Sequence, residues 1–112
     1  MINRDLVAAS SEPIILSILS DEESYGYAII QKVKEKSDGQ MKWTDGMIYP
    51  VLHKLADKGF ISSYWGKSET GRKRKYYAIT DDGKKALAER IAQWQKVTVT
   101  LERLGAIDAF RC

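Results

Sequence analysis

Thr44-Asp-Gly-Met-Ile-Tyr-Pro-Val-Leu-His-Lys-Leu55 is the stretch that decides the fold, because it begins like a helix and leads directly into two β-type runs. Thr44 is a residue type that caps helices, and the apolar residues after it recur at helical spacing. A strand is then predicted over residues 60–65, a basic turn over 67–75 and a second strand over 74–80. A helix followed by two strands around a basic tip is the order of a winged helix-turn-helix, and that order points to DNA. We therefore predict a mainly α fold with a two-stranded β wing.

The predicted helix over residues 44–57 has two different faces when it is projected at about 100° per residue. The apolar face, which should lie in the core, carries Ile48, Val51, Leu52 and Leu55. The opposite face carries Gly46, Tyr49, Pro50, His53 and Asp57, with Met47 and Lys54 beside it. Pro50 removes a backbone hydrogen bond inside the helix at a cost of about 3 kcal/mol, and positions that break a local rule are often functional. We therefore expect this outer face to contact a partner.

Two further helices are expected before this one. The first covers residues 5–19, with a kink or a restart at Pro13. The second is capped by Ser24 and ends at the turn Ser37-Asp38-Gly39. Its residues at helical spacing are Tyr27, Ile30, Val33 and Lys34. This second helix and the helix over 44–57 would form the helix-turn-helix pair.

A long last helix is expected from its capping residue Thr80 to Leu104, with Asp81 and Asp82 in the first turn, where the helix dipole favours negative charge. An apolar seam along it repeats by four and three residues and consists of Leu87, Ile91, Trp94, Thr98 and Leu101. A small winged helix already has its core in its first three helices, so this second stripe needs another surface, which a homodimer supplies. We predict a winged helix-turn-helix domain over residues 1–80 and a C-terminal dimerisation helix over 81–112 that forms one structural unit with the first helix.

The 112 residues fit one domain, and a net charge of +3 is too mild to identify a nucleic-acid partner by itself. The charge is concentrated at the turn between the two strands, where Glu69 is the only acid. The cations of this turn are Lys67, Arg72, Lys73, Arg74 and Lys75. Such a tip suits a phosphate backbone.

One cysteine, Cys112, cannot form an internal disulfide, so the sequence favours a reducing compartment and we expect a cytoplasmic protein. With a single histidine, a His/Cys metal site within one chain is not expected, and no cofactor is expected either. An enzyme is disfavoured, because the sequence has no Gly-rich phosphate loop, metal cluster or Ser/Cys–His pair. The longest apolar stretch, residues 14–19, is far too short for a membrane span, and the N-terminus lacks a signal-peptide layout.

Five spaced motifs in one order give the chain a family resemblance. They are Tyr25-Gly-Tyr, Asp45-Gly-Met-Ile-Tyr-Pro-Val-Leu-His-Lys-Leu, Lys58-Gly-Phe-Ile, Gly71-Arg-Lys-Arg-Lys-Tyr-Tyr and Ile79-Thr-Asp-Asp-Gly. Over roughly residues 13–83 the chain resembles the PadR-type transcriptional repressors, and its short tail resembles the small subfamily that includes multidrug-sensing repressors. The resemblance implies a sequence-specific DNA-binding regulator. It also implies a homodimer through the first and last helices, with the helix over 44–57 in the major groove and the wing on the adjacent backbone.

The resemblance assigns DNA contacts by motif position. Tyr49, His53 and Lys54 would face bases or phosphates of the operator, next to Gly46 on the same outer face. Tyr25 would lie near phosphate at the start of the preceding helix. The wing contact would be made by Lys67, Arg72, Lys73 and Arg74. Because base contacts specify the sequence and phosphate contacts position the protein, only the outer helix face is expected to read bases.

Trp94 is the residue that the resemblance links to an effector. In small drug-sensing members a tryptophan in this segment lies across the dimer axis from its mate, and planar aromatic compounds stack between the two rings. The residues that would line such a site are Leu6, Ala9, Ile91, Val97 and Thr98. Thr98 supplies a hydroxyl and no carboxylate, so the charge of the ligand is left open. The implied function is a repressor that a planar aromatic ligand releases from operator double-stranded DNA.

Two competing interpretations accompany these expectations. One is a winged helix that binds a protein without sequence-specific DNA binding, and a DNA affinity that did not depend on salt would favour it. The other concerns Trp94, since a large ring on an apolar stripe also packs well as plain interface core. Packing roles are also expected for Trp43, Trp65, Tyr76 and Tyr77.

Overall fold

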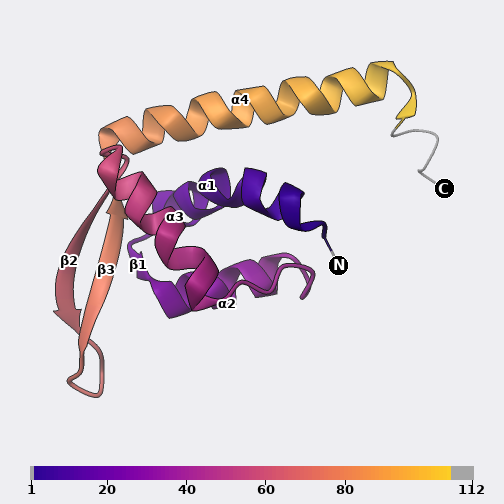
Figure 1. Cartoon of the computed structure of the whole chain (residues 1–112). Helices are drawn as coiled ribbons and strands as arrows, with labels where there is room; N and C mark the ends of the chain where they lie inside the picture. The colour runs from indigo at the N-terminus through magenta and orange to yellow at the C-terminus, as the bar shows by residue number, and fades with distance from the viewer. Residues whose placement is uncertain (1, 107–112) are drawn as a thin grey trace.

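The computed structural model describes residues 2–106, and in that range it has four helices and three strands. In chain order they are α1 (Arg4–Asp21), β1 (Ser24–Tyr25), α2 (Gly26–Lys36), α3 (Asp45–Asp57), β2 (Ile61–Lys67), β3 (Lys73–Ile79) and α4 (Asp81–Arg103) (Figure 1). The predicted mainly helical fold with a β wing is confirmed. Cys112 and the end of the predicted C-terminal segment lie outside the described residues.

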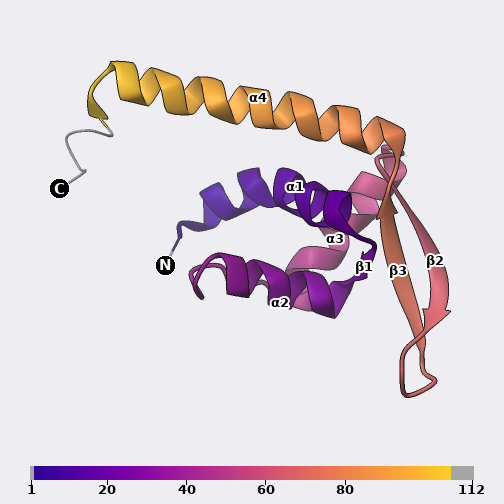
Figure 2. The same cartoon turned by 180° about the vertical axis from the view of Figure 1, so that it is seen from behind.

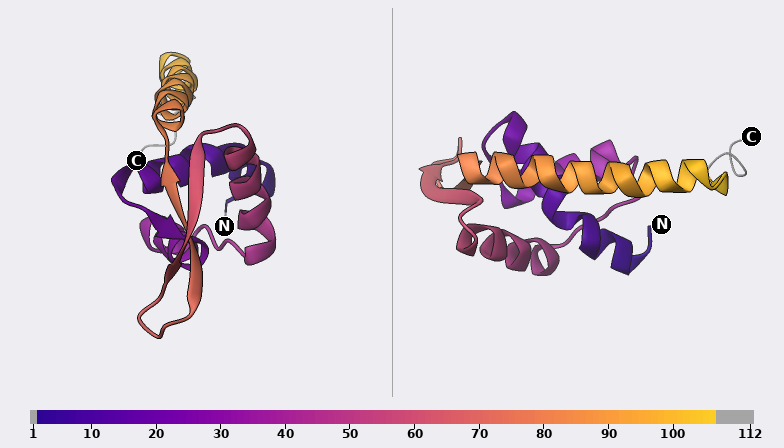
Figure 3. Two further views of the ribbon diagram at one scale, coloured as in Figure 1. Left: turned by 90° about the vertical axis from the view of Figure 1, so that its left-hand side faces the viewer. Right: turned by 90° about the horizontal axis from the view of Figure 1, so that it is seen from above.

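The wing and α4 lie on opposite sides of the helical body. α1 lies between α4 and α2 when the molecule is seen from the front and from behind (Figures 1 and 2). The tip of the β2–β3 hairpin extends away from the body on the side opposite α4 (Figure 3, left). α4 starts at the base of this hairpin and continues past the N-terminal end of α1, so the molecule is elongated, with extents of 53 × 29 × 21 Å. The tip of the wing and the second half of α4 therefore lie on opposite sides of the molecule (Figures 1 and 3).

The core lies where α1, α2 and α3 meet the base of the sheet. Its fully buried side chains are Ile15, Leu16, Ile29, Ile48, Leu52 and Leu55. Trp43 and Tyr77 also belong to this cluster, and both are almost entirely buried, so their predicted packing roles are confirmed. Trp43, directly before α3, and Ile48 inside it both lie in the core, as expected for a hydrophobic staple.

The sheet has a third strand that the sequence analysis missed. Its strand order is β1-β3-β2, with Ser24 opposite Tyr77 and Tyr25 opposite Tyr76. The prediction that Ser24 caps the second helix is wrong, because Ser24 is extended and pairs with β3, and Tyr25 is the N-cap residue. An unpaired edge of β3 offers backbone hydrogen bonds that compete with capping. The buried residues of α2 are Gly26, Ile29 and Val33, whereas Tyr27, which the predicted spacing placed with Ile30 and Val33, is exposed.

α1 is one continuous helix through Pro13, so the predicted restart is wrong. Its N-terminus is capped by Asn3, whose side-chain oxygen accepts a 2.8 Å hydrogen bond from the Asp5 backbone N–H. Burial of Ile15, Leu16 and Leu19 in the core holds the second half of the helix after the proline. Tertiary packing therefore outweighs the local cost of Pro13.

α3 begins and ends as the sequence predicts. Thr44 is its N-cap residue, although its side chain makes no capping hydrogen bond, and Gly59 follows its C-cap with a φ of +78°. The Phe60 N–H donates to the Leu55 carbonyl and the Gly59 N–H donates to the Ala56 carbonyl, which is a Schellman arrangement. The chain therefore reverses directly from α3 into the wing.

The N-terminus of α4 is fastened to the end of α3. The Thr80 hydroxyl accepts from the Gly83 N–H at 3.0 Å and donates to the Gly59 carbonyl at 2.7 Å, which confirms the predicted cap. Gly83 is buried, and a Cβ at this position would overlap the carbonyl oxygen of Phe60. Beyond Arg90 every described residue of α4 through Arg103 is exposed. The helix is thus fixed at its start and exposed to solvent along its second half.

Candidate nucleic-acid interface

A hollow of about 480 Å³ lies between α3, the start of α2 and the wing, and we name it the α3–wing hollow. Six of the predicted DNA-contact residues line it, namely Tyr25, Tyr49, His53, Arg72, Lys73 and Arg74. The other lining residues are Gly26, Tyr27, Trp65, Lys75 and Tyr77. The fold thus brings together residues from three separate motifs.

The outer face of α3 forms one wall of the hollow. Gly46, Tyr49, Pro50, His53 and Asp57 are all exposed, as the helical projection predicts. They are held outward because the opposite face of α3 is fully buried at Ile48, Leu52 and Leu55. The side chains that a partner would meet are therefore fixed by the packing of the core.

Gly26 at the start of α2 leaves room for the ring of Tyr49. A Cβ at Gly26 would stand 2.6 Å from the Tyr49 hydroxyl oxygen and 2.9 Å from the ring carbon that bears it. Tyr49 can lie against the first turn of α2 only because residue 26 has no side chain. The Tyr25-Gly-Tyr motif thus sets the position of a side chain on α3.

The aromatic rings of the wing support its cations. The Arg74 guanidinium lies 3.8 Å from the centre of the Tyr25 ring, which is cation–π geometry. Tyr25 meets Tyr76 edge to face at 5.6 Å, and Tyr76 stacks on Tyr64 at 5.5 Å. A Cβ on Gly66 would collide with the Tyr76 ring, so this glycine lets the ring lie flat across the hairpin. The rings hold Arg74 at the rim of the hollow.

The predicted DNA contacts do not include Trp65 and Lys75, although Lys75 is one of the turn cations that suit a phosphate backbone. The prediction that Trp65 is a packing residue is wrong, because its side chain is 68% exposed. Lys75 is its direct cross-strand partner, with Nζ 6.0 Å from the Trp65 ring and 5.8 Å from the Tyr77 ring. Residues of one strand alternate between two faces, so Trp65 shares a face with Ile61 but lies beyond the core. The exposure of Trp65 could have been predicted from this alternation and from its place four residues beyond Ile61, the buried end of the strand.

Three predicted DNA-contact residues do not line the hollow. Gly46 is exposed near the start of α3, and a Cβ at this position would have only Thr44 Oγ1 nearby, at 4.0 Å. Lys67 is opposite Lys73 at the outer end of the wing. Lys54 lies with its Nζ 3.6 Å from a carboxylate oxygen of Glu12 on α1. These three residues are not part of the lining of the hollow.

Glu12 joins three helices, and the sequence analysis did not identify it. Its carboxylate accepts a 2.7 Å hydrogen bond from Arg90 on α4 and lies 3.3 Å from the ammonium of Lys58 at the end of α3. Burial raises the pKa of Glu12, but the hydrogen bond from Lys58 and the charges of Arg90, Lys58 and Lys54 outweigh burial and lower it overall. The carboxylate is therefore ionised at neutral pH and links α4 to the C-terminal end of α3.

Trp94 lies between two hollows that α1 and α4 form, which we name the α1–α4 hollows. The larger, about 670 Å³, is lined by Leu6, Ile91, Trp94 and Thr98 among mostly apolar residues, and by Lys32 and Lys36 from α2. The smaller, about 230 Å³, is lined by Ala9, Trp94 and Val97 among others. All six residues predicted for an effector site line these hollows. The Trp94 ring is 37% exposed and contributes to both.

Within residues 2–106, no helix is long and apolar enough to cross a membrane. In the same part of the chain, no three His, Cys, Asp or Glu side chains gather as metal ligands would.

A winged helix with a basic hollow between its third helix and its wing defines a DNA-binding regulator. The model of the transcriptional regulator PadR-like family matches residues 15–89, and the chain belongs to this family. The negative transcriptional regulator PadR of Bacillus subtilis is 33% identical over 96 residues, which cover 86% of this chain and 53% of that protein. The chain thus spans about half the length of that relative.

Solved structures agree with the family assignment. A transcriptional regulator from Clostridium thermocellum has a TM-score of 0.81 and 30% identity, covering 88% of this chain and 96% of that one. A PadR-like transcriptional regulator from Bacillus cereus has a TM-score of 0.77 and 34% identity, covering 89% of this chain and 95% of that one. PadR-family regulators bind DNA. As a member of this family, the chain is a DNA-binding transcriptional regulator.

Proposed function

We propose that the chain is a homodimeric repressor that places α3 in the major groove of its operator and the wing on the adjacent backbone. The observation that carries this proposal is the α3–wing hollow. Four of its lining residues are cations and none is acidic. The N-terminus of α2 opens into the same hollow, and helix N-termini favour bound phosphate. A protein-binding winged helix needs no such concentration of positive charge.

Within this proposal the contacts divide into two kinds. Tyr49 and His53, on the exposed face of α3, read bases. The residues that position the protein on phosphate are Tyr25, Lys54, Lys67, Arg72, Lys73 and Arg74. Gly46 leaves the start of α3 free for close approach to the backbone. Two recognition helices in a dimer then select half-sites about one helical turn, or a small multiple, apart.

Fluorescence anisotropy with an operator duplex and a random duplex tests this division. Tyr49→Ala and His53→Ala should weaken operator binding more than random binding. Arg72→Ala and Arg74→Ala should weaken both equally and lower the slope of log affinity against log salt by about one each. Equal losses on both duplexes for all four variants would refute the division, and a salt-independent affinity of the wild type would refute DNA binding as the function.

The dimer is proposed to form through α1 and α4, with residues 1–80 as the DNA-binding domain and 81–112 as the dimerisation segment. The support is the apolar stripe of α4, whose members Ile91, Trp94 and Leu101 remain 41%, 37% and 42% exposed. A monomer would leave this stripe and both α1–α4 hollows in water. A second copy of α4 is the surface that the stripe needs.

Release of the repressor by a planar aromatic compound is the regulatory part of the proposal. Trp94 borders both α1–α4 hollows, so a flat ligand on either side can stack on its ring. The relative named as a negative regulator supports a repressor role. Thr80 and Glu12 connect α4 to the end of α3, which gives a route by which a ligand can change the spacing of two recognition helices. Such coupling is typically worth about 1–3 kcal/mol.

Titration with flat aromatic dyes tests the effector site. Wild type should show saturable quenching of tryptophan fluorescence and a weaker operator affinity at saturation. Trp94→Ala should lose both effects while it stays dimeric, whereas Trp65→Ala, which removes a ring at the other end of the molecule, should keep both. If Trp94→Ala binds the dyes as tightly as wild type, Trp94 is only interface core.

A further inference from the structure

Trp65 is an exposed aromatic ring on the inner wall of the wing. Its backbone is paired with Lys75 in the middle of the hairpin, so its position is fixed. Ile61 and Ser63 precede it on the same face of β2, and Ile61 is buried in the core. This face of β2 is therefore buried at Ile61 and exposed to solvent at Trp65.

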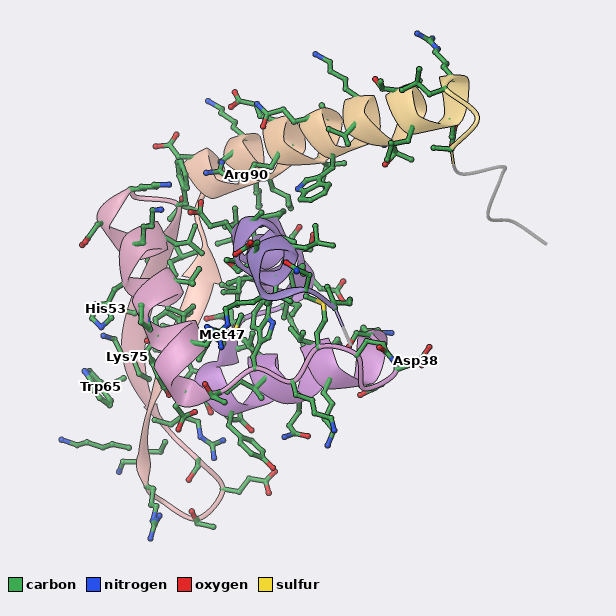
Figure 4. All side chains as sticks on the ribbon, turned by 45° about the vertical axis from the view of Figure 1, so that its right-hand side comes forward. Asp38, Met47, His53, Trp65, Lys75 and Arg90 are labelled. Carbon is green, nitrogen blue, oxygen red and sulfur yellow. The ribbon has the colours of Figure 1, made fainter. Side chains whose placement is uncertain are left out.

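The ring of Trp65 faces the same hollow as the reading face of α3. Tyr49 and His53 line the hollow from α3, and Trp65 and Lys75 line it from the wing. His53, Lys75 and Trp65 lie on one side of the molecule (Figure 4). The ammonium of Lys75 stands beside the ring, 6.0 Å from its centre. An apolar plane and a positive charge are thus presented together.

The height of Trp65 on the wing determines which part of a duplex it can meet. It lies two residues before Lys67, the last residue of β2, so it stands about 7 Å short of the end of the strand at about 3.3 Å per residue, and the turn over residues 68–72 extends beyond that end. If α3 occupies the major groove and the wing lies on the adjacent backbone, the wall between them faces the sugar–phosphate strand that borders the groove. That strand offers an apolar deoxyribose and a phosphate side by side.

We propose that Trp65 is a DNA-contact residue that packs its ring against a deoxyribose of this strand, while Lys75 pairs with the adjoining phosphate. This inference rests on the proposed binding of DNA through the α3–wing hollow. The ring supplies affinity without charge, so its contribution does not depend on salt. A sugar is the same in every nucleotide, so the contribution does not depend on sequence either. These two properties separate Trp65 from both the cations of the wing and the reading residues of α3.

Anisotropy with operator and random duplexes over a series of salt concentrations tests the proposal. Trp65→Ala should lose about five- to tenfold in affinity on both duplexes with an unchanged salt slope, and Trp65→Phe should retain most of the affinity. Lys75→Gln should lower the salt slope by about one. The tryptophan emission of the wild type should shift to the blue when DNA covers the ring, and Trp65→Phe should abolish this shift, because Trp43 is buried and Trp94 lies on α4.

Ser62→Ala is the control, since Ser62 is exposed on the opposite face of the same strand and is not part of the ring stack that holds Arg74. It should stay within about twofold of the wild type on both duplexes. A Trp65→Ala variant that folds and binds random DNA like the wild type would overturn the proposal, and so would a loss confined to the operator, which would assign the ring to a base. If wild type binds neither duplex, it is the proposed function that fails.

Discussion

α3 and α4 are both amphipathic helices, but only α3 has its apolar face covered within the chain. Ile48, Leu52 and Leu55 of α3 are fully buried, whereas Ile91 and Trp94 of α4 are 41% and 37% exposed. α3 therefore has one free face, and that face is polar and stands beside the wing cations. α4 has an apolar face that α1 covers only in part beyond the first turns of the helix. The fold covers the apolar face of α3 within one chain, and the difference is the basis of our proposal that a second molecule covers that of α4.

The largest expected effect comes from a charge placed on the uncovered stripe of α4. Ile91→Asp should shift the protein from dimer to monomer or to insolubility, because a buried and unpaired carboxylate is costly. Light scattering should report about twice the chain mass for the wild type. Thr100→Asp adds the same charge on the opposite side of α4 and should remain dimeric. A wild-type protein that is a stable monomer at micromolar concentration would refute the proposal that a second molecule covers the apolar face of α4.

The second prediction uses the same substitution in the first turn of each helix. Gly83→Ala should destabilise the fold by about 3 kcal/mol, because its Cβ would meet the backbone carbonyl of Phe60, which cannot move aside. Gly46→Ala meets only Thr44 Oγ1 at 4.0 Å and should stabilise α3 by about 0.4–1 kcal/mol.

Urea denaturation measures both free energies of unfolding. Equal effects of the two alanine substitutions would show that the start of α4 is no more tightly fastened than the start of α3. Thr80→Ala should add a loss of about 1 kcal/mol at the same joint, since it removes the cap of α4.

The third prediction concerns Glu12, which connects the two helices. Glu12→Gln should lower the free energy of unfolding by about 1–2 kcal/mol at pH 7, because it removes a partly exposed carboxylate from Arg90 and Lys58. The pKa of Glu12 is lowered in the folded protein, so its stabilisation is complete above the ordinary value of 4.5 and is lost as the pH falls through the folded-state pKa.

The difference between wild type and Glu12→Gln should therefore shrink below pH 4.5. Glu89→Gln removes an exposed acid from α4 and serves as the control for loss of one charge. A difference that stays constant from pH 7 to acid would mean that the ion pairs contribute nothing and the Gln variant suffers only from packing.

The sequence predicted those features that depend on local signals. The caps Thr44 and Thr80, the glycine turn after Lys58 and the two faces of α3 are confirmed, since each needs only neighbouring residues. Ser24 was assigned wrongly because its strand exists only when β3 lies beside it. Glu12 was missed for the same reason, as its partners on α3 and α4 are distant in sequence. Trp65 was misjudged because its residue type suggested burial, whereas its place beyond the core edge decides its exposure.

The smallest expected effect on stability comes from Gly26→Ala, which sharpens the comparison at the reading face of α3. The new methyl group would stand 2.6 Å from the Tyr49 hydroxyl oxygen, so the ring must move, yet the start of a helix tolerates alanine well. We expect the free energy of unfolding to change by less than about 0.5 kcal/mol and operator affinity to fall about fivefold, or about 1 kcal/mol. If Gly26 acts through Tyr49, the double variant with Tyr49→Ala should bind the operator no more weakly than Tyr49→Ala alone, because the two changes share one contact. Losses that simply add would place the effect of Gly26 in the backbone of α2 and not in the position of the Tyr49 ring.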